Sequence, residues 1–471
     1  MMKNNLLGNI RRTACVLMGF LVILIAYISY VQVIEQDFLK GHPLNRRNIE
    51  AASSIQRGQI LDRNGDKLAT NLPNKDEKGR FKREYPLGRM TTHIVGYDSL
   101  QYGKSGIESS YNGYLSGMSN LSRSFGPFTR LWQENAGNDV VLTIDSSLQA
   151  TAYQALGNHR GAVVVIDPRT GAILSMVSKP SFDPAELASQ WQSISSAADA
   201  PLLNRATQGL YPPGSIIKVM VAEAALSKRI TSPNSSFDCS GTLPIGRDYT
   251  LSEDKQTAHG HLSLKEALAV SCNITFGRLS LELGRNNMED VFEKYGFQKP
   301  LTTDLQESAC QLPKFNSLSD GDLAQLGIGQ TSLLVTPLRM AVLAEVFANH
   351  GVIMKPFLVQ RVVTPDGTVI EQNQPQQWLS PANPGLANLV AEMMVEAVAN
   401  GTGGAAQIRG IKVAGKTGTA ENPHGASHAW FIGFAPADNP QIAVAVIIEN
   451  GGSGGGVAAP VARKIFTQAL H

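Results

Sequence analysis

The chain has 471 residues, a formal net charge of +2 and 17% charged residues. This near-neutral balance, without a basic stripe, argues against nucleic acid as a partner, and the length exceeds what one hydrophobic core usually supports. The nine histidines and four cysteines show none of the sequence spacings typical of zinc sites, so neither a metal nor a cofactor is predicted.

An apolar run at residues 13–34 contains no acidic or basic residue. At a rise of about 1.5 Å per residue, it is long enough to cross a bilayer core of roughly 30 Å. Arg11 and Arg12 precede it and Glu35 follows, so the positive-inside rule makes residues 1–12 a short cytoplasmic tail. We predict an uncleaved, single-pass signal anchor in the cell membrane, with the rest of the chain outside. A cleaved signal peptide is the alternative, but no A-x-A cleavage site follows.

Residues 35–138 are polar and rich in turns, which predicts a small, mainly β domain. An Asn-Gly pair between two short apolar segments, just after Arg57-Gly58, is a strong hairpin signal. We expect Arg57, Asp62 and Arg63 to form a structural ion pair here. Glu108 ends a second glycine-rich turn and is predicted to face the interior. Neither segment has a catalytic pattern.

The remaining segment, 139–471, alternates between strand and helix patterns. Its predicted elements are a strand at 139–145 leading into a helix, a hairpin at 162–177, a block of helices, strands at 411–421, 428–436 and 442–448, and a final helix near 460–470. Strands from both ends of the segment therefore enclose a helical block. This arrangement predicts an α+β domain with one antiparallel sheet.

The string Ser215-Ile-Ile-Lys218 follows Pro-Pro-Gly and opens an apolar helical stretch. Proline is tolerated only in the first turn, so the helix should begin near Gly214. Residues i and i+3 share a helix face, so Ser215 Oγ and Lys218 Nζ can meet. A lysine accepts a proton only when neutral, which requires burial or a nearby positive charge, here that of Lys416. The similar spacing at Ser252 lies in a polar segment that we interpret as a loop.

The string Ser271-Cys-Asn273 ends a helix that opens with Ser263 and Glu266, a capping-box pair. A second helix is predicted over 274–283, so the motif occupies a corner between two helices. A serine there can relay a proton, and an asparagine can offer a donor and an acceptor to a peptide amide. Capping of the helix ends is the alternative role for both residues.

The string Lys416-Thr417-Gly418-Thr419 begins the first of the three C-terminal strands. Glycine in an edge strand allows a substrate backbone to approach and pair in β fashion. The lysine and the hydroxyl groups suit a substrate carboxylate. A glycine-rich strand start without a ligand is the alternative.

Two glycine-rich strings imitate other sites. Gly451–Gly455 matches G-x-S-x-G, but no acid follows it, so we interpret it as a loop. Gly401–Ala406 resembles a dinucleotide fingerprint but follows a helix instead of a strand. Cys239 and Cys310 could pair in an exported domain, although two reduced, buried thiols are our preferred interpretation.

Taken in order, these motifs resemble those of class B penicillin-binding proteins, the extracytoplasmic D,D-transpeptidases of bacterial cell-wall synthesis. The resemblance covers nearly the whole chain. It includes R-G-x-I-x-D-R-x-G at 57–65, G-x-x-G-I-E at 103–108, L-T-I-D at 142–145, N-R-A…Y-P-P-G-S-x-x-K at 204–218, T-P-L at 336–338, and the S-x-N and K-T-G-T motifs. It implies a pedestal or dimerisation-like domain at 35–138 and a penicillin-binding, β-lactamase-like transpeptidase domain at 139–471.

The resemblance also implies roles for the motif residues. Ser215 would attack the penultimate D-alanine carbonyl of a peptidoglycan stem peptide, Lys218 would accept its proton, and Ser271 would relay that proton to the departing D-alanine. A neighbouring stem amine would then attack the acyl-enzyme. β-Lactams would mimic D-alanyl-D-alanine and trap Ser215.

The remaining residues would bind the substrate. Asn273 would bind a substrate amide, and the segment from Lys416 through Thr417 and Gly418 to Thr419 would bind the substrate, with Lys416 and Thr419 holding its carboxylate. Backbone N–H groups of Ser215 and Thr419 would form the oxyanion hole.

The resemblance further implies a partner. The region before residue 139 is too short for a glycosyltransferase domain, so a membrane glycan polymerase of the SEDS type would supply the glycan strands. Hydrolysis by a D,D-carboxypeptidase or a serine β-lactamase remains an alternative, and so does a scaffold that mainly activates the polymerase.

Overall fold

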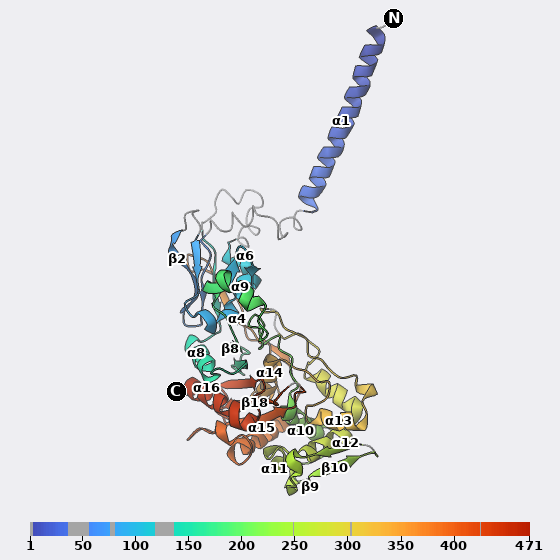
Figure 1. Cartoon of the computed structure of the whole chain (residues 1–471), viewed down its shortest axis with the longest axis vertical. Coiled ribbons are helices and arrows are strands. Elements are labelled where there is room, and N and C mark those ends of the chain that lie inside the picture. The colour runs from blue at the N-terminus through green and yellow to red at the C-terminus, as the bar shows by residue number, and fades with distance from the viewer. Residues whose placement is uncertain are drawn as a thin grey trace.

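The computed structural model describes residues 3–35, 56–75, 81–117, 136–247, 249–301, 304–423 and 425–471. Helix α1 (Lys3–Val33) stands apart from the rest of the protein (Figure 1). Within its segment Gly8–Val33, a window of 18 residues has a mean hydropathy of 2.5. Among the described residues, α1 is the only helix long and apolar enough to cross a membrane, which fits the predicted membrane anchor.

The part of the body nearest α1 is built on a six-stranded sheet in the order β15-β14-β6-β1-β2-β3. Its strands are β1 (Ile60–Leu61), β2 (Lys67–Lys75), β3 (Phe81–Glu84), β6 (Asp139–Leu142), β14 (Val359–Val363) and β15 (Val369–Gln372). β1 and β2 form the predicted hairpin, in which Gly65 takes a φ of +93° that suits glycine. β14 and β15 reach this sheet from far along the chain.

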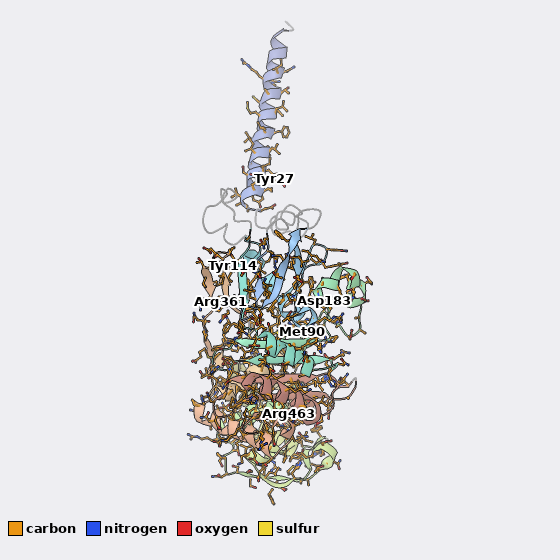
Figure 2. All side chains as sticks on the ribbon, turned by 90° about the vertical axis from the view of Figure 1, so that its left-hand side faces the viewer. Tyr27, Met90, Tyr114, Asp183, Arg361 and Arg463 are labelled. Carbon is orange, nitrogen blue, oxygen red and sulfur yellow. The ribbon has the colours of Figure 1, made fainter. Side chains whose placement is uncertain are left out.

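Short elements cover this sheet and connect it to the rest. They are η1 (Gly88–Met90), α4 (Thr92–Val95), β4 (Asp98–Ser99), β5 (Gly103–Lys104), α5 (Gly106–Ser110), α6 (Asn112–Leu115), η3 (Pro184–Glu186) and α9 (Leu187–Ser195). Tyr114 of α6 donates a hydrogen bond to Glu371 of β15 over 2.5 Å. Figure 2 shows Tyr114 and Arg361 of β14 near the same end of the body. The contact joins two parts of the chain that are 257 residues apart.

The ion pair predicted among Arg57, Asp62 and Arg63 was wrong. Arg57 Nε instead lies 2.5 Å from Glu108 Oε2, and the Asp62 carboxylate accepts backbone N–H groups of its own turn and of Ser146. Glu108 is fully buried, as predicted. The error arose because the partner of Arg57 is 51 residues away, where no local pattern indicates it.

The larger part of the body contains a five-stranded antiparallel sheet in the order β17-β18-β19-β7-β8. The strands are β7 (Gly161–Ile166), β8 (Ile173–Lys179), β17 (Ala414–Ala420), β18 (His428–Ala435) and β19 (Ile442–Ile448). Val163 and Val165 face a core shared with α8 (Ser146–Ala155) and α16 (Ala459–Leu470), whereas Val164 faces the helical block. The sheet thus has helices on both faces, and the predicted α+β fold is confirmed.

The helical block holds the first two motifs. Its helices are α10 (Lys218–Ser227), α11 (Leu264–Ala269), α12 (Asn273–Lys294), α13 (Asp320–Gly327), α14 (Pro337–Ala348) and α15 (Pro384–Ala399). Nine of the ten residues of α10 are buried, so this helix is surrounded by protein. The predicted capping box of Ser263 and Glu266 is present, and the helix after the second motif is interrupted at Gly284, as predicted, before it continues.

Two small hairpin-like pairs lie against this block (Figure 1). β9 (Ser236–Cys239) pairs with β12 (Gly260–Ser263), and β10 (Thr242–Ile245) pairs with β11 (Tyr249–Ser252). Ser252 therefore belongs to a strand, and the prediction that it lies in a loop was wrong. The strand was missed because the polar segment that follows it, including η5 (Asp254–Gln256), makes the whole stretch resemble a loop.

Candidate active site

Ser215 lies in a turn that is packed closely against two strands. It belongs to η4 (Gly214–Ile217), which continues directly into α10. Gly214 has a φ of +57°, and a Cβ there would lie 2.8 Å from Thr419 O of β17. Trp430 of β18 donates from its ring nitrogen to Pro212 O over 3.0 Å. These contacts fix the half-buried Ser215 beside the strand that carries the third motif.

Lys218 is fully buried one turn after Ser215. Its Nζ donates to Ser271 O over 2.7 Å, to Ser271 Oγ over 3.3 Å and to Asn273 Oδ1 over 2.7 Å. The sequence predicted that Lys218 Nζ and Ser215 Oγ can meet, but in this structure its hydrogen bonds go to the second motif instead. Burial lowers the pKa of Lys218 to about 8, with the charge of Glu253 opposing the shift.

Ser271 occupies the predicted corner between α11 and α12. Its backbone has a φ of +65°, a left-handed conformation that costs a residue with a side chain about 1–3 kcal/mol and is frequent at active sites. Its Oγ lies 3.3 Å from Lys218 Nζ and 2.9 Å from Lys416 Nζ. One hydroxyl therefore joins the two lysines and can pass a proton between them.

Lys416 is also fully buried. Its Nζ donates to Ser271 Oγ and to Thr417 O, each over 2.9 Å. Burial, and then the charge of Lys218, hold the pKa of Lys416 well below its ordinary value. Two ammonium groups this close disfavour each other, so the pair supplies a neutral amine near neutral pH.

Asn273 begins α12 and uses both ends of its amide within the protein. Its Oδ1 accepts from Lys218 Nζ, and its Nδ2 donates to Ser252 O over 3.3 Å. The second motif is thereby connected to α10 on one side and to β11 on the other.

The third motif lies on β17, which forms one edge of the five-stranded sheet. Thr419 is exposed, whereas Thr417 is almost buried and shares a 2.6 Å hydrogen bond with Thr402. A Cβ on Gly418 would lie 3.0–3.1 Å from Ile216, Pro213 and Trp430. Glycine is needed here because the strand and the Ser215 turn lie so close together.

These elements surround a cleft of about 710 Å³. Of the predicted site residues, Ser215, Ser271, Asn273, Thr417 and Thr419 line it, whereas the two lysines are buried behind it. The structure thus brings all three motifs together from segments up to 204 residues apart, since Ser215 and Thr419 meet at one cleft.

Several residues of the cleft were missed by the sequence analysis. They include Tyr249, Glu253, His259, Gln325, Gln330, Thr402, Glu421 and Ser453. Thr402 and Ser453 belong to the two glycine-rich strings that were interpreted as chemically inert. A better signal was available in their glycines, because Gly401 is packed against Ala269 O, two residues before Ser271, and Gly454 is packed against the third motif. A Cβ on Gly454 would lie only 2.4 Å from Gly418 O.

The four cysteines are all free thiols. Cys239 lies beside Cys272, with their sulfur atoms 2.9 Å apart, and not beside Cys310. The preferred interpretation of Cys239 and Cys310 as reduced thiols agrees with this arrangement.

Two family models match the chain. Residues 161–467 match the penicillin binding protein transpeptidase domain, and residues 57–140 match the penicillin binding protein A dimerisation domain. The predicted resemblance to penicillin-binding proteins is confirmed by these matches.

Named relatives and solved structures agree. The peptidoglycan D,D-transpeptidase PbpA of Mycolicibacterium smegmatis is 34% identical over 98% of this chain and 99% of its own length. The peptidoglycan D,D-transpeptidase MrdA of Acinetobacter baumannii is 32% identical over 82% of this chain and 66% of its own length. A structure of penicillin-binding protein A from Mycobacterium tuberculosis, a ceftriaxone acyl-enzyme complex, has 32% identity and a TM-score of 0.83, covering 90% of this chain and 100% of that one.

Proposed function

The chain belongs to the penicillin-binding protein transpeptidase family, and on this premise we propose that it is a class B peptidoglycan D,D-transpeptidase whose nucleophile is Ser215. The observation that carries this assignment is the pair of buried lysines joined through Ser271 at a cleft that Ser215 lines. Such a pair supplies a base for a serine without a histidine. β-Lactams would be its covalent inhibitors.

The proposed reaction has two stages. Ser215 Oγ attacks the carbonyl carbon of the penultimate D-alanine of a stem peptide, and its proton passes to Lys218. As the peptide bond breaks, Ser271 delivers a proton to the departing D-alanine amine. An amine of a neighbouring stem then attacks the ester carbonyl, which forms the cross-link and restores the Ser215 hydroxyl. The Ser215–Lys218 contact would tighten when substrate binds, as catalytic contacts often do.

We assign substrate binding to the third motif and to Asn273. The exposed Thr419 and the neighbouring Thr417 offer hydroxyls to the substrate carboxylate, while Gly418 keeps the strand edge close to the acylated serine. Lys416 contributes positive potential from behind the strand whenever it is protonated. Backbone N–H groups of Ser215 and Thr419 are the proposed oxyanion hole, because Gly214 and Thr419 are packed against each other.

The membrane arrangement is part of the same proposal. Helix α1 would hold the protein in the cell membrane with residues 1–12 inside, because Arg11 and Arg12 precede its apolar segment. Residues 35–138 would form the pedestal and 139–471 the transpeptidase domain. A membrane glycan polymerase of the SEDS type would be the partner that supplies glycan strands.

The test is the intact mass of the full-length protein in detergent after incubation with benzylpenicillin. A single stable adduct is expected, and Ser215→Ala should abolish it. Ser252→Ala is the matched control, because Ser252 lines the same cleft with the same S-x-x-K spacing. Loss of the adduct in the control but not in Ser215→Ala would contradict the assignment.

A second assay separates cross-linking from hydrolysis. A peptide ending in D-alanyl-D-alanine is incubated with the protein and a D-amino acid as acceptor. A transpeptidase exchanges the terminal residue, whereas a D,D-carboxypeptidase only shortens the peptide. An adduct that clears rapidly would instead indicate a β-lactamase.

A further inference from the structure

Beside the Ser-Cys-Asn corner, four side chains of metal-binding type converge, and two of them, Glu253 and His259, also line the cleft. They are Cys239 at the end of β9, Glu253 after β11, His259 before β12 and Cys272 at the N-cap of α12. One potential ligand atom from each lies within 4.8 Å of all the others. Three of the four are buried, and His259 is half-buried. None of the four has a role in the reaction proposed above.

The distances suit a single tetrahedral ion. The sulfur atoms are 2.9 Å apart, Cys239 Sγ is 3.3 Å from His259 Nδ1, and Cys239 Sγ is 3.5 Å from Glu253 Oε1. Around zinc, with Zn–S of about 2.3 Å and Zn–N of about 2.0 Å, two sulfurs lie roughly 3.8 Å apart and a sulfur and a nitrogen roughly 3.6 Å apart. The side chains need to open by less than about 1 Å to admit the ion.

The surrounding hydrogen bonds hold the four side chains in place. Cys272 Sγ accepts from Thr275 N over 3.3 Å and from Thr275 Oγ1 over 3.2 Å. Glu253 Oε1 accepts from Ile274 N over 2.9 Å. The backbone N–H of His259 donates to Cys239 O over 3.0 Å. Such outer contacts orient ligands before a metal arrives.

We propose that Cys239, Glu253, His259 and Cys272 form a closed, structural zinc site. Two thiolates, an imidazole and a carboxylate are ligands that select zinc over magnesium or calcium. Four protein ligands leave no open position for catalytic water. Binding would release the two thiol protons, as zinc binding to cysteines generally does.

The proposed metal site would affect the active site by fixing the position of the Ser-Cys-Asn corner. Cys272 stands between Ser271, which joins the two lysines, and Asn273, which bonds Lys218. A metal held by Cys272 and by the two small strand pairs would fix this corner against the rest of the domain. The four ligands come from four elements, at sequence spacings that match no zinc motif, so the prediction of no metal followed from the sequence alone.

The test begins with the wild-type full-length protein, purified in detergent without chelators and with its affinity tag removed. Elemental analysis should find about one zinc ion per chain. Co²⁺ exchanged into the protein should give the sulfur-to-cobalt charge-transfer absorption of thiolate ligands. This spectrum needs no variant and is therefore independent of any folding defect.

Variants then assign the ligands. Cys239→Ser and His259→Gln should lose most of the zinc and should melt at a lower temperature, and a chelator should lower the melting temperature of wild type but not of these variants. Cys310→Ser and His261→Gln are matched controls, because Cys310 lies outside the cluster and the His261 side chain is 83% exposed on the same strand pair.

Two outcomes would overturn the proposal. One is wild-type protein that stays free of zinc after dialysis against Zn²⁺ while both thiols react with a thiol reagent. The other is a Cys239–Cys272 disulfide found by peptide mapping of the protein as isolated. Penicillin adduct formation is measured on the same samples. A wild-type protein that forms the adduct but binds no zinc would contradict the metal site and not the proposed function.

Discussion

Replacing Glu449 with alanine should destabilise the protein strongly, because Glu449 neutralises a buried arginine. Arg205 is 1% exposed, and its Nε lies 2.7 Å from Glu449 Oε1. Tyr211 OH donates to the same oxygen over 2.7 Å, and Arg160 pairs with the other oxygen over 2.8 Å. Removal of one partner of a buried ion pair typically costs about 3–5 kcal/mol, because the remaining charge stays buried.

The pair should also give a pH signature. Burial opposes ionisation of Glu449, but the hydrogen bond from Tyr211 and the charge of Arg205 together lower its pKa. The stabilisation is therefore complete above the carboxyl's unfolded pKa and is lost as the pH falls through its folded pKa. The difference in melting temperature between wild type and Glu449→Ala should be largest near neutral pH and should shrink in acid.

The assay is a thermal melt of the full-length protein in detergent. At about 2 °C per kcal/mol for a large domain, the expected fall for Glu449→Ala is roughly 6–10 °C. Asp438→Ala is the control, because its pair with Lys412 is 71% and 65% exposed and should contribute about 1 kcal/mol or less. Equal melting temperatures for the two variants would refute the reasoning.

Three further outcomes are expected. Because burial lowers the pKa of Lys218 to about 8, its neutral fraction and the acylation rate by benzylpenicillin should rise about tenfold between about pH 7 and pH 9; a flat profile would exclude Lys218 as the base. Gly329→Ala should slow acylation by at least about tenfold, because its Cβ would lie 2.1 Å from Gly214 O. Gly367→Ala is the control: open space surrounds it, so it should lower the stability by about 1 kcal/mol and leave the acylation rate unchanged. Burial raises the pKa of Glu345 well above its ordinary value, so its contribution to the stability of the wild type falls as the pH rises. The melting temperature of Glu345→Gln should therefore exceed that of wild type by a margin that grows from about pH 5 to pH 8, and parallel pH profiles would contradict this.

The sequence could predict the elements of the site because each motif has a local signature. Pro-Pro-Gly before Ser215 indicates a helix start, the capping box at Ser263 indicates the next helix, and hydrophobic runs indicate the C-terminal strands. Their order in the chain indicates one antiparallel sheet with helices between its strands. The structure contains these features, but the strand predicted at 139–145 forms β6 of the six-stranded sheet instead of joining the sheet of the C-terminal strands.

What depends on tertiary contacts could not be predicted. Arg57 meets Glu108, and β14 joins the sheet of β1, only because distant segments pack together. Lys218 bonds to Ser271 instead of Ser215, at a corner where Ser271 has a left-handed backbone that no local propensity predicts. The convergence around Cys272 likewise requires the two small strand pairs to pack against α12.

The two halves of the active site have separate supports. The Ser215 turn is held by the sheet through the bond from Trp430 to Pro212, and by the bond from Gly214 N to Gly329 O over 2.9 Å. The strained corner at Ser271 is held by the lysines and by the proposed metal ligands beside it. A conformation that costs about 1–3 kcal/mol persists only where such contacts compensate for it.

Because the two supports are separate, the effects of substitutions in each of them on the acylation rate should be independent. Glu449→Gln disturbs the segment leading to Ser215, through Tyr211, and Cys239→Ser disturbs the corner at Ser271. Within the described part of the chain, the hydrogen-bond and ion-pair partners given for Glu449 do not overlap with those of Cys239, so their effects on the free energy of activation for acylation should add within about 0.5 kcal/mol. The double variant should therefore acylate at a rate within about a factor of two of the product of the two fractional rates. A double variant no slower than the slower single variant would show that the two supports are one network, and the zinc site would then act on the serine turn as well as on the corner.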